Sequence, residues 1–289
     1  METNGRRKRK RRGSPRFAEW PGRAGISVPA MVWLCLLLIL PSDAAGLLTL
    51  RKTGPDRAPV FVASHPLPAP MEVEFQLVQG AAETVSDPPM PARIVVPPGP
   101  ASEVFRLRPL GETGAWSYRY QYRFVMGDPA ARHAPERPYR PPIPAGERFR
   151  LAGMGEGGEV HAATILMPPG TPVVCARAGR VVEAGERAFQ RRIGRRTLEG
   201  TTAFVRLIHA DGTFGVYAHL ARDGVAVRPG ARVERGEVLG RVGREIEPPS
   251  LVFMVQRNAG MRLESVPFRF EGPDGGAVEP MRGMILTAR

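Results

Sequence analysis

Hydrophobic and polar residues alternate along much of the chain, in short runs that Pro and Gly clusters interrupt. The runs recur about every ten residues, a spacing typical of antiparallel β-sandwiches. This alternation has the period of a strand and not that of a long amphipathic helix. It predicts an all-β protein whose first folded domain is a small antiparallel β-sandwich over residues 46–127. The clearest runs are 60–62, 71–78, 92–96, 104–107 and 116–124.

Three tyrosines occupy alternate positions of the last run and therefore share one face of the predicted strand. They are Tyr118, Tyr120 and Tyr122. Such a face can stack on carbohydrate, or it can pack into the sandwich core. The core interpretation is favoured, because the intervening residues are polar and suit a solvated face.

A proline-rich segment separates the two halves of the chain. Five prolines lie between Asp128 and Ile143. Proline fixes its own φ and removes a backbone donor, so the segment is predicted to be extended. We interpret residues 128–145 as a linker that also carries several arginines.

A second β domain is predicted over residues 146–289, where strand and turn signals continue. It contains a short internal sequence repeat. Pro169-Gly170 and Pro229-Gly230 each predict a turn, and each turn is followed by a strand that contains valine. Paired hairpins of this kind build a flattened β-sandwich. Lipoyl and biotinyl carriers use similar hairpins, but a carrier needs a lysine at a hairpin tip. Lys52 is the only lysine beyond the N-terminal segment, so a carrier function is excluded.

Four motifs in this second domain occur in an order and spacing that resemble the M23 (lysostaphin-like, LytM-like) zinc endopeptidases. They are Gly170 to Val174, Val205 to Gly212, Tyr217-Ala218-His219-Leu220 and Pro249-Ser250-Leu251-Val252-Phe253. The resemblance covers residues 146–270. It implies a lysostaphin-like sandwich of the duplicated hybrid motif type, and a zinc site with one position open for water.

The zinc chemistry that the resemblance implies is largely missing from the sequence. The aspartate ligand of the family falls on Thr164, the last histidine ligand on Val252, and an acid-base histidine on Ser250. The first histidine ligand falls on Val160. His161 is one residue away and is a weak metal candidate, because a one-residue slip turns a strand side chain to the opposite face.

His219 alone lies in register with the family, and we treat it as a vestigial catalytic candidate. Four glutamates could in principle replace the lost ligands, but none has ligand spacing, and all are expected to be solvated loop charges. They are Glu156, Glu159, Glu245 and Glu247. We therefore expect no cofactor, with zinc expected only if the site is rearranged. His209 is predicted to cap the turn that follows it.

The N-terminal segment 1–45 accounts for much of the basic charge. Residues 1–27 hold nine Arg or Lys against two Glu, in a chain of net charge +13. The basic run, the apolar run that follows and the small residues after it have the order of a secretory signal. A cleaved signal is favoured over a retained membrane anchor, because the apolar run is shorter than the roughly 20 residues that span a bilayer. No nucleic-acid partner is expected.

Cys35 lies inside this apolar run, which leaves Cys175 as the one cysteine of a processed chain. No internal disulfide is then available, and Cys175 is predicted to be a core side chain.

The leading hypothesis is an exported, non-catalytic M23-like module of the periplasm or cell envelope. It would bind peptidoglycan or an envelope protein and could regulate a wall hydrolase. The alternative is an active zinc endopeptidase that cleaves peptidoglycan peptide cross-links with a rearranged site of His161, His219 and a glutamate. A third hypothesis is a purely structural assembly through the N-terminal sandwich. Under any of the three, membrane contact is expected only through the N-terminal segment if it is uncleaved.

Overall fold

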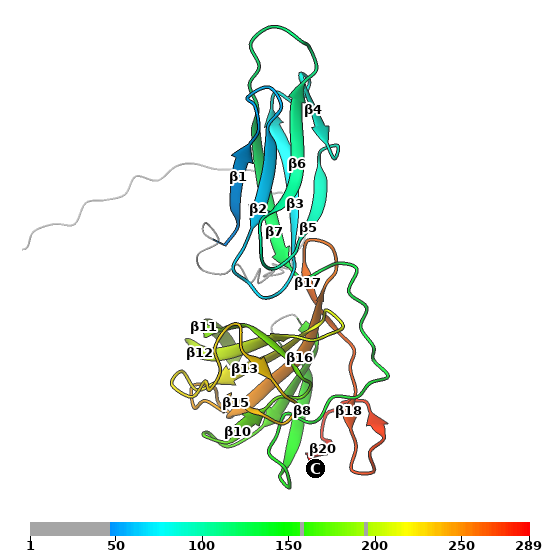
Figure 1. Ribbon diagram of the computed structural model, residues 1–289. Helices are drawn as coiled ribbons and strands as arrows, with labels where there is room; N and C mark the ends of the chain where they lie inside the picture. Colours follow the sequence, from blue (N-terminus) through cyan, green and yellow to red (C-terminus); the bar gives the residue numbers. More distant parts are fainter. Residues whose placement is uncertain (1–46, 157–158, 194–195) are drawn as a thin grey trace, which may run out of the picture. The chain divides into compact units, whose positions relative to one another are not determined.

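A computed structural model of the chain describes residues 47–156, 159–193 and 196–289, and these residues contain 20 strands and no helix (Figure 1). The all-β prediction is confirmed. The described part of the chain has no helix of the length and hydrophobicity that a membrane span requires. The predicted signal segment, residues 1–45, lies outside the described residues.

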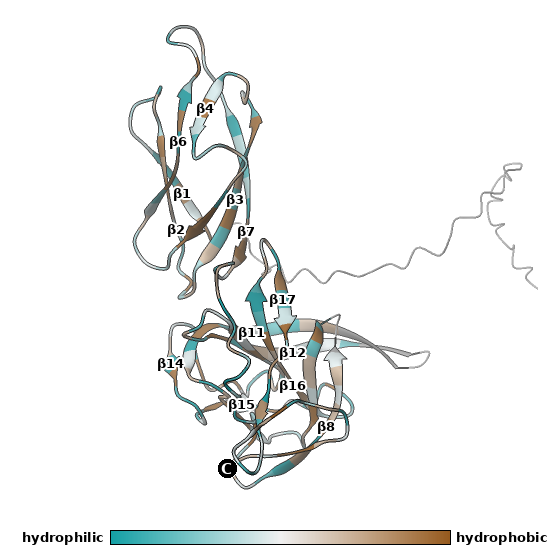
Figure 2. Cartoon of the chain, turned by 90° about the vertical axis from the view of Figure 1, so that its right-hand side faces the viewer, coloured by the Kyte–Doolittle hydropathy of each residue, from teal (hydrophilic) through white to brown (hydrophobic). Residues whose placement is uncertain are grey.

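Two sheets form the N-terminal sandwich, one in the order β1-β2-β6-β4 and the other in the order β5-β3-β7. Their strands are β1 (Thr49–Thr53), β2 (Val60–Ser64), β3 (Met71–Gln79), β4 (Thr84–Asp87), β5 (Ala92–Val96), β6 (Ser102–Pro109) and β7 (Arg119–Met126). Hydrophilic and hydrophobic segments alternate along β3 (Figure 2). This alternation lets one face of each sheet join a shared core while the other meets water.

Aromatic rings fill the core of this sandwich. Phe61 stacks on Phe105 with ring centroids 4.3 Å apart, and Tyr120 meets both rings edge-on. Tyr118 also packs against the core cluster, whereas Tyr122 is 39% exposed. The tyrosine face is thus mainly a core face, as the alternation predicts, and only its last member opens to solvent.

A nine-stranded sheet with the order β14-β11-β12-β13-β16-β9-β8-β20 organises the second half, and β17 pairs with β16 beside it. Its strands are β8 (Arg148–Glu156), β9 (Glu159–Leu166), β11 (Gly179–Ile193), β12 (Arg196–Ile208), β13 (Phe214–Leu220), β14 (Arg232–Val233), β16 (Ser250–Asn258), β17 (Leu263–Val266) and β20 (Ile285–Thr287). Two short pairs complete the fold, β10 (Pro172–Val174) with β15 (Val238–Arg241) and β18 (Phe270–Glu271) with β19 (Ala277–Val278). The two repeated Pro-Gly turns, at residues 169–170 and 229–230, precede β10 and β14.

The central strand β16 is buried on both faces, and its side chains alternate between two clusters. Leu251, Phe253 and Val255 join the main core, which we call the core face of the sheet. Val252 and Met254 join a smaller cluster on the other face, which we call the groove face. Cys175 belongs to the main core and is fully buried, as the sequence predicts.

The proline-rich segment contributes to this core as well. Tyr139 and Ile143 are fully buried in the main cluster. The Tyr139 N–H donates to Arg269 O at 2.7 Å, and the Arg140 N–H donates to Ala176 O at 3.1 Å. The segment predicted as a linker therefore supplies core side chains, which its five prolines do not indicate.

Candidate functional site

Three cross-strand partners form a row on the groove face, where the resemblance places the metal site. Ala218 of β13 pairs with Val252 of β16, and Val252 pairs with Thr164 of β9. Directly opposite residues in antiparallel strands carry their Cβ atoms about 4.5–5.5 Å apart. We call Ala218, Val252 and Thr164 the site row. The sheet thus brings together Thr164 and Val252, the two positions where the sequence lacks metal ligands.

The side chains of the site row do not suit a zinc ion. Val252 is 2% exposed and packs with Ala162, Val216 and Met254, while Thr164 supplies one hydroxyl. Zinc takes imidazole, thiolate or carboxylate ligands, usually three from the protein at a catalytic site. Within the described residues, no three His, Cys, Asp or Glu side chains form a group that could hold a metal. The donor set in the row therefore does not fit the ion that the resemblance implies.

His219 lies beside the site row in a β-bulge. Ala203 pairs with Leu220 and Phe204 pairs with Ala218, so His219 is an extra residue on β13. Its φ of 68° is left-handed, which is uncommon for a residue other than glycine. Its carbonyl accepts a hydrogen bond from the Gly243 N–H at 2.9 Å. Bulges re-aim side chains and often lie next to active sites, so the geometry keeps His219 as a candidate.

Ser250 lies on β16 two residues before Val252 and therefore on the same face of the strand. It is 1% exposed, and its Oγ has no hydrogen-bond partner among the described residues. A hydroxyl buried without a partner costs about 1–3 kcal/mol. The groove face thus retains an unsatisfied polar atom at the position that corresponds to the acid-base histidine of the family.

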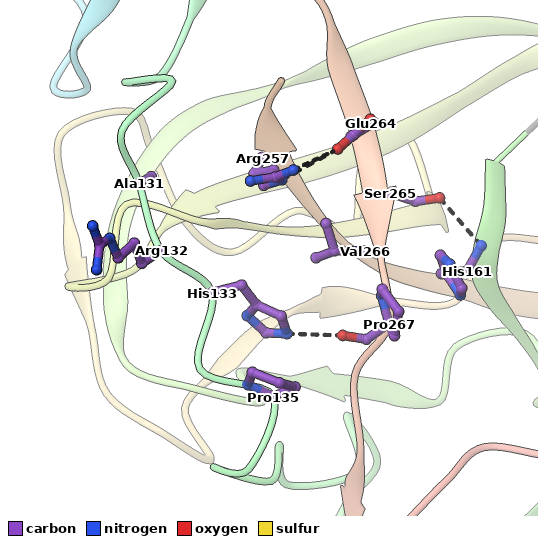
Figure 3. A pocket seen from close by; sticks show the side chains of 10 residues that line it. All are labelled: Ala131, Arg132, His133, Pro135, His161, Arg257, Glu264, Ser265, Val266 and Pro267. Atoms are coloured by element: carbon purple, nitrogen blue, oxygen red, sulfur yellow. Dashed lines mark hydrogen bonds and ion pairs between the residues drawn. The ribbon is translucent and has the colours of Figure 1, made fainter. Parts of the chain in front are cut away.

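His161 lies away from the site row, because β9 is distorted where it begins. Met154 of β8 pairs with Ala163 of β9, and Glu156 pairs with Glu159. An advance of two residues along β8 therefore corresponds to an advance of four residues along β9. The extra residues displace this part of β9 from regular pairing. The His161 N–H donates to Ser265 Oγ at 3.1 Å, and its side chain lines a separate cavity with Val266 and Pro267 (Figure 3). Val160, in register with the first ligand of the family, is 71% exposed.

The candidate glutamates differ in their surroundings. Glu159 accepts hydrogen bonds from Gln256 Nε2 at 2.8 Å and from the Ser265 N–H at 3.1 Å, so its carboxylate is engaged. Glu247 is exposed, as predicted, and the Glu156 side chain lies outside the described residues. Glu245 differs from the prediction of a solvated charge, since its Oε2 is buried without a partner in the described part of the chain. Its position in a loop gave no sign of this burial.

The His209 backbone closes the turn that follows it, with the His209 N–H donating to Thr213 O at 2.8 Å, while the side chain that caps the turn is that of Asp211 and not the His209 ring. Asp211 Oδ1 accepts hydrogen bonds from the Thr213 N–H at 3.0 Å and the Thr213 hydroxyl at 2.6 Å. The His209 ring instead lies 3.0 Å from Ala178 O through Nδ1. A carbonyl only accepts, so Nδ1 carries the proton. Burial lowers the pKa of His209 to about 4, which keeps the ring neutral near pH 7.

An arginine joins this turn to the proline-rich segment. Arg177 Nη1 pairs with Asp211 Oδ2 at 2.9 Å, and its guanidinium carbon lies 3.6 Å from the centroid of the Tyr139 ring. Cation–π contacts of this length are favourable, more so when they are partly shielded from water. This cluster has a structural role, because it holds Tyr139 in the core.

The family model of peptidase family M23 matches residues 159–263 of this chain. That range contains β9, β13 and β16, and with them the whole site row. The chain contains a peptidase family M23 domain. No curated protein matches the chain.

Several solved structures are similar to parts of this M23-containing chain. The catalytic domain of lysostaphin from Staphylococcus simulans is 23% identical, with 46% of this chain and 88% of that chain covered and a TM-score of 0.30. A mutant catalytic domain of the prophage-encoded M23 protein EnpA from Enterococcus faecalis is 19% identical, with 48% and 95% covered and a TM-score of 0.28. Csd3 of Helicobacter pylori is 12% identical, with 83% and 72% covered and a TM-score of 0.30.

Proposed function

We propose that the M23 domain of this chain is a non-catalytic binding module of the cell envelope, which holds peptidoglycan or an envelope protein at its groove face. The composition of the site row is the observation that carries the proposal. Thr164 and Val252 lie opposite each other where the resemblance places two zinc ligands, and neither supplies the imidazole or carboxylate that a zinc hydrolase needs. A hydroxyl and two apolar side chains can contact a ligand, but they cannot activate a metal-bound water.

The retained scaffold supports a role in binding rather than simple decay. Thr164 and Val252 still lie directly opposite each other, and the left-handed bulge at His219 persists beside them. A backbone conformation of this kind costs roughly 1–3 kcal/mol, so the surrounding structure must hold it in place. Ala218 is the row member that remains partly exposed, and it marks where a ligand would approach.

Export is part of the proposal and rests on the N-terminal sequence. The order of basic, apolar and small residues in segment 1–45 suits delivery to the periplasm or envelope, by a cleaved signal or as an inner-membrane anchor. Bound in the envelope without hydrolysing it, the module could regulate a wall hydrolase. We expect the functional protein to need no zinc.

The test measures metal content, binding and cleavage on the same full-length protein. We expect less than stoichiometric zinc by mass spectrometry, co-sedimentation with purified peptidoglycan sacculi or with an extract of envelope proteins, and no release of soluble wall fragments. Stoichiometric zinc together with fragment release that EDTA abolishes would instead establish the alternative, an active endopeptidase. Failure to sediment with both sacculi and envelope proteins would reject the binding role.

A pair of matched substitutions locates the binding surface. Ala218→Leu adds bulk to the partly exposed member of the site row and is expected to weaken sedimentation severalfold. Ala145→Leu adds the same bulk at an exposed alanine outside the family match and should leave sedimentation unchanged. Equal effects of the two substitutions would show that the groove face is not the binding surface.

A further inference from the structure

A cavity with a volume of about 670 Å³ lies apart from the site row (Figure 3). Three parts of the chain line it: the extended segment 131–135, His161 in the distorted start of β9, and a wall made by Arg257 and residues 264–267. Its volume lies within the range of small-molecule sites. Residues 131–135 and 264–267 fall outside the family match, so much of this cavity is not part of the matched M23 region.

Arginine dominates the charge of the cavity. Arg257 donates from Nε and Nη2 to Glu264 Oε1 at 3.2 Å and 3.0 Å, and Arg262 Nη2 donates to Glu264 Oε2 at 3.3 Å. Two guanidinium groups therefore share one carboxylate. Arg132 lines the same cavity, is exposed, and makes no ion pair with another described residue. The lining thus carries more positive than negative charge.

Two neutral side chains of the cavity can each donate a hydrogen bond to a ligand. Ser265 Oγ accepts the His161 N–H, which leaves the serine O–H available to donate. The His161 ring lines the cavity and makes no hydrogen bond to another described residue. His133 Nε2 lies 2.8 Å from Pro267 O and therefore carries its proton there, which ties the extended segment to the wall that contains residues 264–267.

We infer that this cavity binds a small ligand through an oxyanion, a carboxylate or a phosphate. Arg132 and the outer side of the Arg257 guanidinium supply the positive charge, while the Ser265 hydroxyl and the His161 ring supply hydrogen-bond donors. The planar fork of a guanidinium can donate two hydrogen bonds to two oxygens of a carboxylate or of a phosphate. Arg257 already donates to one oxygen of a carboxylate in this cavity, that of Glu264.

The experiment titrates the full-length protein by calorimetry with two probes, glutarate and inorganic phosphate, at constant ionic strength with chloride as the competing anion. We expect saturable binding of at least one probe. Binding of glutarate alone would assign a carboxylate ligand, and binding of phosphate alone a phosphate ligand, and each outcome supports the inference. Absence of saturable binding for both probes would overturn it.

Two arginine substitutions test the location of the anion. Arg132→Ala is expected to weaken binding about tenfold, because it removes one charge-assisted partner. Arg148→Ala removes an exposed arginine of β8 that does not line the cavity, and should change binding less than twofold. Arg132 is exposed, so the variant is expected to fold, and circular dichroism checks this. Equal losses in both variants would show nonspecific attraction to a basic surface and would overturn the inference.

Discussion

The two faces of β16 show how one strand can keep a fold while its chemistry changes. On the core face, Phe253 is fully buried and its ring lies 5.1 Å from the ring of Tyr217. On the groove face, the neighbouring Val252 is almost equally buried but packs in a small cluster without aromatic rings, with Ala162, Val216 and Met254. Burial alone does not distinguish the faces. Aromatic packing marks the core face, whereas the left-handed bulge at His219 marks the groove face.

This difference indicates that stability constrains the residues of the core face, whereas function constrains those of the groove face. The core face determines stability, because its large side chains interlock at the density of a protein interior. The groove face tolerates an unpartnered Ser250 and a left-handed His219, features that cost stability without an evident structural benefit. Such features concentrate at functional sites, which agrees with the binding role proposed for this face.

Truncation of neighbouring residues on the two faces should produce the largest contrast. Phe253→Ala is expected to lower the free energy of unfolding by about 3–5 kcal/mol, because it removes a ring from the centre of the core. Val252→Ala should cost about 2 kcal/mol, since it removes two methyl groups. Urea unfolding monitored by far-ultraviolet circular dichroism measures both values, because residues 146–289 contain no tryptophan to serve as a fluorescence probe. Equal losses would show that the groove face is packed as specifically as the core.

Acid should weaken the protein through His209, which is buried on the core side of the β12–β13 turn. Burial lowers its folded pKa to about 4, below the ordinary value for an unfolded chain of about 6.5. The unfolded state therefore binds the proton first, so the stabilising contribution is complete above about pH 6.5 and declines as the pH falls towards 4. The loss should reach roughly 2 kcal/mol at pH 5.

His209→Asn provides the control for this pH effect, because its side-chain amide can still donate to Ala178 O but does not titrate. Unfolding free energies of the two proteins at pH 7 and pH 5 give the measurement. The wild type should lose more stability than the variant over this interval. Parallel losses in the two proteins would assign the acid sensitivity to other groups.

Removal of a single hydroxyl should affect stability differently on the two faces. Tyr217→Phe deletes the acceptor of the Ala176 N–H, a buried bond of 2.8 Å, and should cost about 1–3 kcal/mol. Ser250→Ala deletes a hydroxyl with no described partner and should leave stability unchanged or raise it by up to about 1 kcal/mol. If Ser250 serves the ligand, the same substitution should weaken sedimentation with sacculi or envelope proteins. A clear loss of stability in Ser250→Ala would show that its hydroxyl has a structural partner.

Local sequence patterns predicted the strands well and the loops poorly. The alternating runs over 71–78 and 92–96 closely match β3 and β5, because their period of two follows directly from strand geometry. The burial of Tyr139 in the core could not be predicted in this way, because a single aromatic residue among prolines forms no hydrophobic periodicity. The buried Oε2 of Glu245 escaped prediction for the same reason, because burial of a loop depends on what packs over it.

The sequence by itself determined the all-β class, the order of the M23 motifs, and the residue types at the implied metal positions. These are properties of local pattern and of chemical identity, and neither depends on how distant strands pair. Only the tertiary structure decided that Thr164 and Val252 are neighbours, that His161 lies in a separate cavity, and that His219 occupies a bulge. Those outcomes depend on register between strands far apart in the chain, and a single extra residue in a strand changes which side chains meet.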